Sequence, residues 1–335
     1  MHRIKFIAVL GILLLLLSAC GKTEVTVSFF TMDTFLNMRV YGMSSKRLEI
    51  LKEEALRLEN LFSVTRPDSE IARLNETGLL MDPSPETRDL LEKALQIGRE
   101  TEGALDVTLY PLVREWGFTT GSYQVPAPER IRQLLDLVDY RRVSLSEAAI
   151  RLEEGMALDL GSIAKGYTAD YLLARLREEG VTSALLNFGG NVQLIGPRGD
   201  GNLWQIAIYN PLDSNTVGIL SLADKAIVTS GGYERHFTGE DGQDYWHILD
   251  PATGYPARGG LLSVTVVGEE GWRCDALSTA LFVMGPEKAR EYWQKHRDFD
   301  LVLMTEEGRV IITEGLEESF FLTSGQTEIW TLDEN

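Results

Sequence analysis

Cysteine and histidine are scarce in this chain of 335 residues, which has two cysteines and four histidines. No His-Glu-x-x-His motif and no cluster of cysteine and histidine occurs, so a zinc site is disfavoured. The Gly-x-Ser-x-Gly motif is absent, and Cys274 has no histidine near it in the sequence, which disfavours nucleophilic hydrolysis. The Gly-x4-Gly-Lys-Ser/Thr order of a P-loop is absent too. Phosphate or metal chemistry in this chain must therefore use other groups.

Positive charge is the second deficit. The chain has 32 Lys and Arg against 50 Asp and Glu, which gives a net charge of −18. This balance disfavours nucleic acid or an anionic membrane surface as a partner. Hydrophobic residues make up 44% of the chain, and no internal repeat or Pro/Gly-rich linker divides it. The chain can therefore bury a sizeable core, as a single large domain or as two lobes.

The N-terminus has the pattern of an export signal. A basic start is followed by an apolar run of 14 residues, 6–19, which is too short for a helix that spans a membrane. The run ends in Leu17-Ser18-Ala19-Cys20, which resembles a bacterial lipobox. We expect residues 1–19 to be a lipoprotein signal peptide, Cys20 to carry lipid, and 20–28 to be a linker. An uncleaved anchor or an ordinary signal peptide is the alternative. A lipid on Cys20 would leave Cys274 as the one free thiol, with no internal disulfide.

Periodicity along the rest of the chain predicts a mixed α+β fold. Two short strands are expected over 24–42, on either side of Met32-Asp33-Thr34, and a hairpin over 141–154. The expected helices cover 45–62, 84–103, 128–139, 162–179, 273–285 and 286–296, and the strands of the second half cover 184–188, 191–196, 204–210, 226–230, 261–268 and 300–304.

The segment Arg273–Gly285 predicts a buried helix with one polar face. Asp275, Ser278 and Thr279 fall together at helical spacing among apolar residues, and a carboxylate in such surroundings is costly unless something pairs it. Carboxylate and hydroxyl oxygens suit Mg²⁺, which shares its ligands with substrate phosphates. Alternatively, Asp275 is a helix N-cap and the hydroxyls bond to the preceding turn.

A second polar group lies in 156–176. Asp159 ends an apolar strand, Gly161 breaks it, and Ser162 can cap the helix that follows. A helix N-terminus with Lys165 one turn inside suits a phosphate. An ordinary strand, turn and helix with a surface lysine explains the same residues.

His247 precedes a turn at Asp250–Gly254 and lies beside aromatic residues. A lone histidine in that setting is more often a hydrogen-bonded core residue than a catalyst. Gly189-Gly190 between two strands fits a tight hairpin turn. Residues 233–235 after the next glycine pair form either a ligand loop or a solvated corner.

Together these segments resemble the FAD:protein FMN transferase (ApbE) family. The resemblance extends from Phe29 to Met284 and rests on these motifs in this order: TMDT, LFSVTRPDSEIARLN, GALDVTLYPLVREWGF, ALDLGSIAKGYTAD, NFGGN, VTSGGYERHF, HILDPATGYP and DALSTALFVMG. It implies a single transferase domain over 29–335, with T-fold-like mixed sheets, packed helices and two lobes around a ligand cleft.

The resemblance also implies the reaction and the site. Members use Mg²⁺ to cleave the FAD pyrophosphate, transfer FMN to a Thr or Ser hydroxyl of a target protein, and release AMP. By similarity, Asp275 and Thr279 bind Mg²⁺ with Ser162, and Ser278 lies in the same shell or touches the nucleotide. His247 and Asp275 are the candidates for activating the acceptor. The FAD contacts implied are Met32, Ala104, Leu105, Asp106, Asp159, Lys165 and Leu249.

Three residues depart from the common pattern of the family. Asp33 replaces glycine, Thr65 replaces an aromatic or amide residue near the flavin, and Tyr110 replaces glycine. These changes bear on ligand affinity more than on the reaction. We expect an extracytoplasmic, membrane-anchored flavin transferase. An FAD pyrophosphatase and a non-catalytic FAD-binding lipoprotein are the alternatives, and the motifs disfavour a solute-binding lipoprotein.

Overall fold

The computed structural model describes residues 23–323 and 327–331, and its central element is a large sheet. Neighbouring strands are antiparallel throughout, except for a parallel pair at one edge, β15 and β17. In spatial order the nine strands are β1 (Glu24–Thr31), β2 (Thr34–Tyr41), β6 (Ala184–Phe188), β7 (Asn191–Ile195), β10 (Ala226–Gly231), β13 (Leu261–Gly268), β14 (Phe299–Thr305), β15 (Val310–Thr313) and β17 (Thr327–Trp330).

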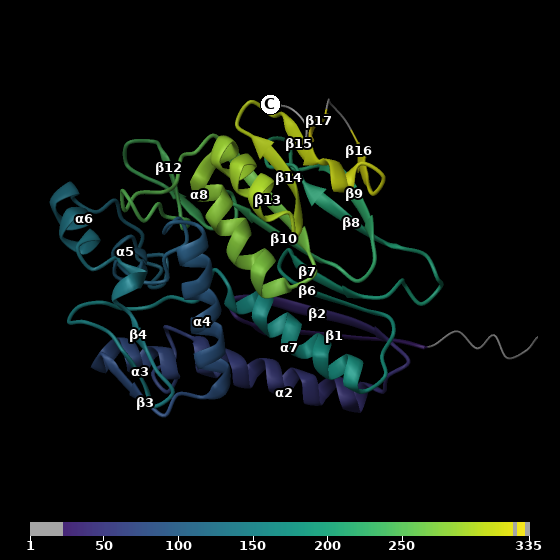
Figure 1. Ribbon diagram of the computed structural model, residues 1–335, viewed down its shortest axis with the longest axis horizontal. Coiled ribbons are helices and arrows are strands. Elements are labelled where there is room, and N and C mark those ends of the chain that lie inside the picture. Colours follow the sequence, from purple (N-terminus) through teal and green to yellow (C-terminus); the bar gives the residue numbers. More distant parts are fainter. Residues whose placement is uncertain (1–22, 324–326, 332–335) are drawn as a thin grey trace, which may run out of the picture.

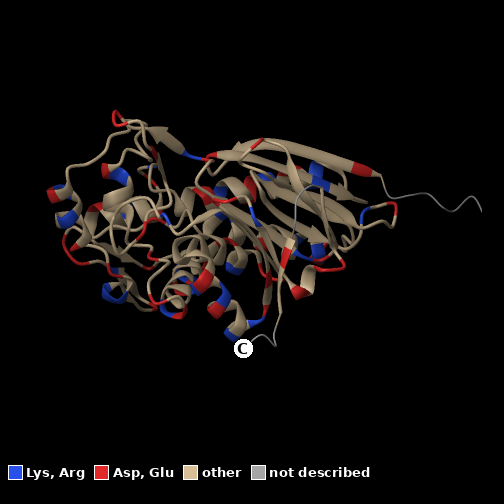
Figure 2. Cartoon of the chain, turned by 90° about the horizontal axis from the view of Figure 1, so that it is seen from above, with Lys and Arg blue, Asp and Glu red and all other residues tan. Residues whose placement is uncertain are grey.

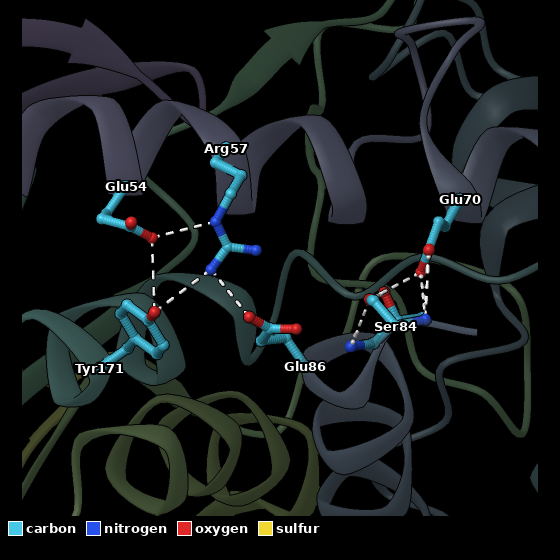
Figure 3. A network of polar contacts seen from close by, with 7 residues as sticks. Glu54, Arg57, Glu70, Ser84, Glu86 and Tyr171 are labelled. Carbon is cyan, nitrogen blue, oxygen red and sulfur yellow. Dashed lines mark hydrogen bonds and ion pairs between the residues drawn. The ribbon is translucent and has the colours of Figure 1, made fainter. Parts of the chain in front are cut away.

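Helices cover one face of this sheet: α2 (Ser45–Phe62), α7 (Ala164–Glu178) and α8 (Gly271–His296), with α4 (Pro85–Glu100) against α8 (Figure 1). Polar contacts tie the helices together at their exposed edges (Figure 3). Arg57 of α2 donates from Nε to Glu54 at 3.0 Å and from Nη2 to Glu86 of α4 at 2.8 Å and to the hydroxyl of Tyr171 in α7 at 3.3 Å.

The other face of the large sheet packs on a second sheet of three strands. These are β16 (Phe320–Leu322), β9 (Thr216–Leu222) and β8 (Trp204–Tyr209), in that order, and η2 (Glu314–Leu316) precedes β16. Val192, Ile227 and Val302 of the large sheet meet Trp204 and Leu220 of the small one in a buried apolar core. The large sheet is therefore covered on both faces.

The remaining elements form a second part of the molecule beside the large sheet (Figure 1). Leu112, Trp116, Ile131 and Tyr245 form a core of their own there, whereas Ile71, Leu74, Leu80 and Ile150 join the larger core beneath the helices that cover the large sheet. The elements are α3 (Glu70–Thr77), β3 (Leu79–Met81), α5 (Tyr110–Glu115), α6 (Pro128–Leu135), η1 (Tyr140–Arg142), β4 (Ser144–Leu145), β5 (Ala149–Arg151), β11 (His236–Thr238) and β12 (Asp244–Trp246).

The predicted α+β class is confirmed, together with the two N-terminal strands and the hairpin of β4 and β5. The prediction missed α3, although Ser69 caps it and Gly78 ends it in the left-handed region. The helices expected over 273–285 and 286–296 are the two halves of α8, and their division is confirmed because the backbone leaves the helical conformation at Gly285, where φ is 77°.

Two further expectations concern the termini and the membrane. The signal peptide and Cys20 lie outside the described residues. Within the described residues, none of the helices combines the length and the apolar character that crossing a membrane requires.

Candidate functional site

A cavity of about 710 Å³ lies where the two parts of the molecule meet, which is within the usual range for small-molecule sites. Its walls come from the turn between β1 and β2, the end of α2, the start of α7, and the loops that follow α4 and β10. All seven predicted FAD contacts line it: Met32, Ala104, Leu105, Asp106, Asp159, Lys165 and Leu249. The FAD contacts that the family resemblance implies are therefore brought together around one cavity by the fold.

Asp275 lies at the bottom of this cavity with only 4% of its surface exposed. One carboxylate oxygen, Oδ2, accepts a hydrogen bond of 2.8 Å from the backbone N–H of Gly166 in the first turn of α7. Burial raises the pKa of Asp275, while Lys165 and that N–H favour the ionised form. Because α8 begins at Gly271, with Glu270 at its N-cap position, the alternative that Asp275 caps the helix is wrong.

Thr279 lies one turn after Asp275 and lines the cavity with it, as helical spacing predicts. Ser278 does not line the cavity, contrary to its expected place beside the metal or the nucleotide. Its hydroxyl is fully buried and donates to the carbonyl of Asp275 at 2.8 Å. The same oxygen lies 2.8 Å from Oγ of Ser230, which does line the cavity. We therefore place Ser278 behind the ligand-facing groups.

The start of α7 differs from the prediction in one respect. The N-cap position is Ile163, which has no capping side chain, so Ser162 is not the helix cap. Ser162 lines the cavity from the preceding turn, and Asp159 holds that turn by accepting the N–H of Gly161 at 2.8 Å. Burial raises the pKa of Asp159. Lys165 donates to the carbonyl of Gly161 at 3.3 Å, which keeps its ammonium group at the cavity.

Asn191 is a cavity residue that sequence reasoning missed. It is 2% exposed, and its amide is close enough to Asp275 to favour the ionised carboxylate. Neither polar atom of the amide makes a hydrogen bond of ordinary geometry within the described residues, and the same holds for Oγ1 of Thr119 in the cavity wall. Buried polar groups of this kind require a partner, and a bound ligand can supply it. The signal in the sequence was the second asparagine of NFGGN. It was missed because a tight turn at the two glycines explained the motif without it.

The oxygen donors fit a magnesium ion that shares its ligands with a substrate. Within the described residues, no three His, Cys, Asp or Glu side chains gather to form a metal site. Six acidic side chains line the cavity, and of these Asp275 lies one helical turn from the Thr279 hydroxyl, with the backbone beside Ser162 in the same cavity wall. Mg²⁺ is commonly held by one or two carboxylates together with phosphates of the substrate and water. The residues therefore suit Mg²⁺ only in combination with a phosphate ligand.

His247 also lines the cavity, as the family resemblance implies. Its Nδ1 lies 3.3 Å from the carbonyl oxygen of Arg235, and its backbone N–H donates to the same oxygen at 3.0 Å. Burial, followed by the positive charges of Arg235 and Lys165, lowers its pKa to about 3. The imidazole is therefore neutral at pH 7. Within the described chain Nε2 has no hydrogen-bond partner, so it can accept a proton.

The three departures from the family pattern lie at different distances from the cavity. Asp33, at the mouth, has a φ of 59° and pairs with Arg235 across a gap of 3.1 Å. Thr65 also lines the cavity. Tyr110 does not, because its side chain borders a separate hollow and its hydroxyl donates to the carbonyl of Val64 at 3.4 Å. Asp33 and Thr65 can therefore affect the ligand directly.

Lys and Arg residues are interspersed with Asp and Glu residues along the chain in both parts of the molecule (Figure 2). The basic residues that line the cavity are Lys165 and Arg235. These two side chains are therefore the cations that an anionic ligand would meet there.

Comparisons with known proteins identify the family of the chain. Residues 32–303 match the ApbE family. The chain is 32% identical over 303 residues to an FAD:protein FMN transferase of Escherichia coli K12, covering 85% of this chain and 86% of that protein. It is 34% identical over 290 residues to one of Vibrio cholerae, covering 82% and 86%.

Solved structures give the same result. An ApbE protein of Thermotoga maritima superposes with a TM-score of 0.82 at 31% identity, covering 88% of this chain and 98% of that one. The apo flavinyl transferase of Pseudomonas stutzeri gives 0.81 at 28% identity, covering 92% and 100%. The chain therefore belongs to the ApbE family.

Proposed function

We propose that this chain, an FAD:protein FMN transferase by its family, uses Mg²⁺ to transfer FMN from FAD to a Thr or Ser hydroxyl of an extracytoplasmic protein. The observation that carries the proposal is the cavity itself. It places a buried carboxylate, a neutral histidine and a lysine at the N-terminal turn of a helix around one space large enough for a nucleotide. Transfer of FMN from a pyrophosphate to a hydroxyl uses one group to hold the metal, one to accept the proton and one to position the phosphates.

The reaction exchanges one phosphorus–oxygen bond for another. The acceptor hydroxyl oxygen bonds to the phosphorus on the flavin side of the pyrophosphate, and the bond from that phosphorus to the bridging oxygen breaks, so that AMP leaves with the oxygen. Asp275 and Thr279, with the backbone beside Ser162, would hold Mg²⁺, which would offset the charge of the pyrophosphate and favour ionisation of the acceptor. The charge of Lys165 and the positive end of the α7 dipole would attract the phosphates.

His247 is the proposed acceptor of the proton. With a pKa of about 3 the ring is neutral over the whole physiological range, so it has a nitrogen that can accept a proton at the cavity, and a base this weak requires the metal to lower the pKa of the acceptor hydroxyl. Asp275 would be occupied by the metal and already accepts the N–H of Gly166 at Oδ2. We assign Asp275 to the metal and His247 to the proton.

The extracytoplasmic site follows from the N-terminal sequence. Signal residues 1–19 and a lipidated Cys20 would place the enzyme outside the cytoplasmic membrane. The expected linker over 20–28 is too long, because β1 begins at Glu24 and residues 24–28 are part of the large sheet. Cleavage would leave 30 basic against 50 acidic residues, so the lipid rather than surface charge would hold the protein there.

An FAD pyrophosphatase is the second candidate, because Nε2 of His247 can accept a proton from water as well as from a protein hydroxyl. The same site would then release FMN and AMP without labelling a protein. The groups that hold the nucleotide would be unchanged, so only the products separate the two activities.

The test uses the chain from Gly21 onward with FAD, Mg²⁺ and an extracytoplasmic domain that contains an acceptor Thr. Intact mass should show one FMN added to the acceptor, and EDTA or Asp275→Ala should abolish the addition. Asp224→Ala, at an exposed aspartate that does not line the cavity, is the matched control and should keep the activity. Release of FMN and AMP without a labelled acceptor would favour the pyrophosphatase. Binding of FAD without either product would contradict both activities.

A further inference from the structure

Asp170 is a partly buried carboxylate on α7, outside the cavity wall, and the proposed reaction does not use it. Its Oδ1 accepts the N–H of Gly271 at 2.9 Å, and its Oδ2 accepts the N–H of Trp272 at 2.8 Å. These are the first two residues of α8. Glu270, at the N-cap position, makes no capping bond with its own side chain, so a carboxylate 101 residues earlier in the chain supplies the cap.

A second carboxylate makes the reverse contact. Asp275 of α8 accepts the N–H of Gly166 in the first turn of α7. Each helix therefore gives one carboxylate to backbone N–H groups in the first turn of the other, and the two helices lie side by side (Figure 1). Gly166 and Asp170 are four residues apart, as are Gly271 and Asp275, so the four groups occupy one turn of each helix.

The first turns of the two helices are in close backbone contact. A Cβ atom on Gly166 would lie 2.2 Å from the carbonyl oxygen of Gly271 and 2.7 Å from Cβ of Asp275. Gln193 of β7 donates from Nε2 to the carbonyl of Gly166 at 3.0 Å, and a Cβ atom on Gly271 would lie 1.6 Å from that nitrogen. The start of α8 is thus fixed on three sides: by Asp170, by the Gly166 backbone and by Gln193.

We propose that Asp170 is a positioning residue for magnesium binding, because it holds the first turn of α8 so that Asp275 and Thr279, in the turns that follow, face the cavity. The inference rests on the metal role in the proposed function. If the cap had a purely structural role, replacing Asp170 would change only the stability of the fold. A positioning role adds weaker metal binding, since groups that orient a metal ligand typically contribute about 10–100-fold in affinity.

The experiment compares Asp170→Asn with the unchanged chain. An asparagine has one oxygen for two N–H donors, so one of the two capping bonds is lost at almost constant volume. Asp224→Asn is the matched control, because Asp224 also accepts a glycine N–H, that of Gly196 at 2.7 Å, in a turn away from the cavity. Mg²⁺ is titrated calorimetrically into each protein with FAD bound, and melting temperatures are recorded in EDTA.

We expect Asp170→Asn to raise the half-saturating Mg²⁺ concentration by at least tenfold and Asp224→Asn to leave it unchanged. Asp170→Glu keeps a carboxylate, so its half-saturating Mg²⁺ concentration should lie between those of the unchanged chain and Asp170→Asn. If Asp170→Asn does not fold, the comparison of Asp170→Glu with the unchanged chain decides the question. A lower melting temperature with unchanged Mg²⁺ binding would overturn the positioning role. If the unchanged chain binds no Mg²⁺, the metal in the proposed function is wrong and the positioning role is rejected with it.

Discussion

His247 should lower the stability of the folded protein in acid, and replacing His247 should remove this effect. Its pKa is about 3 in the folded chain and 6.5 as an ordinary imidazole, so below pH 6.5 the unfolded chain binds a proton that the folded chain does not. Stability is therefore lost as the pH falls from 6.5 towards 3, by up to about 1.4 kcal/mol for each pH unit. Between pH 7 and pH 5 the loss from this residue is about 2 kcal/mol at most, and since the ring is partly exposed we expect 1–2 kcal/mol.

The assay is urea unfolding at pH 7, 6 and 5, with the free energy of unfolding compared between the unchanged chain and His247→Asn. Asparagine keeps a donor for the carbonyl of Arg235 but does not titrate. The variant should therefore lose about 1–2 kcal/mol less than the unchanged chain between pH 7 and pH 5. His236→Asn, at an exposed histidine, should keep the original pH dependence. Equal losses in the unchanged chain and His247→Asn would refute the assignment of a neutral, poorly protonated ring.

Three further changes test the cavity. Asp275→Asn should abolish Mg²⁺-dependent transfer without lowering the melting temperature in EDTA, because burial already disfavours the ionised carboxylate; a clear loss of stability in EDTA would contradict this view. Gly166→Ala should lower the free energy of unfolding by about 1–3 kcal/mol, because its Cβ would overlap the start of α8, and urea unfolding measures the loss. Asp33→Gly removes an exposed ion pair with Arg235 and relieves a φ of 59°, so stability should change by less than about 1 kcal/mol. FAD affinity, measured by flavin fluorescence, should then rise because Arg235 no longer faces a carboxylate, and unchanged or weaker binding would show that Asp33 does not compete with the ligand.

Elements that bury one face were predictable from the sequence. In β2, Leu36, Met38 and Val40 are fully buried while the residues between them are exposed, which is the alternation that predicts a strand. Buried residues of α2, such as Leu48 and Leu51, recur at intervals of three and four. In both elements the local pattern and the packing agree, so no knowledge of distant residues was required.

Elements that are short, or that depend on contacts between residues far apart in the sequence, were not predictable. α3 has eight residues and buries only Ile71 and Leu74 within that length, too few for a period to stand out. The start of α7 was misplaced at Ser162 because a serine before an apolar run looks like a cap, whereas here it turns towards the cavity. Ser278 has the spacing from Asp275 that a ligand would have, but in the folded chain its buried hydroxyl donates to the carbonyl of Asp275 and the residue does not line the cavity.

The carboxylate of Asp275 shows where sequence reasoning ends and what the structure adds. The sequence establishes that the group is out of place in an apolar helix, and physical chemistry requires a partner for it. The partner in the folded chain is the N–H of Gly166, 109 residues earlier, which only the contact of α7 with α8 makes available. That partner is insufficient, because burial still raises the pKa of Asp275 despite the N–H and the charge of Lys165. A divalent cation in the cavity would reverse the balance, since it favours the ionised form at short range. Because a cation would pair with the ionised carboxylate, we expect Mg²⁺ with FAD to stabilise this protein more than FAD alone, and equal melting temperatures under the two conditions would contradict the metal role of Asp275.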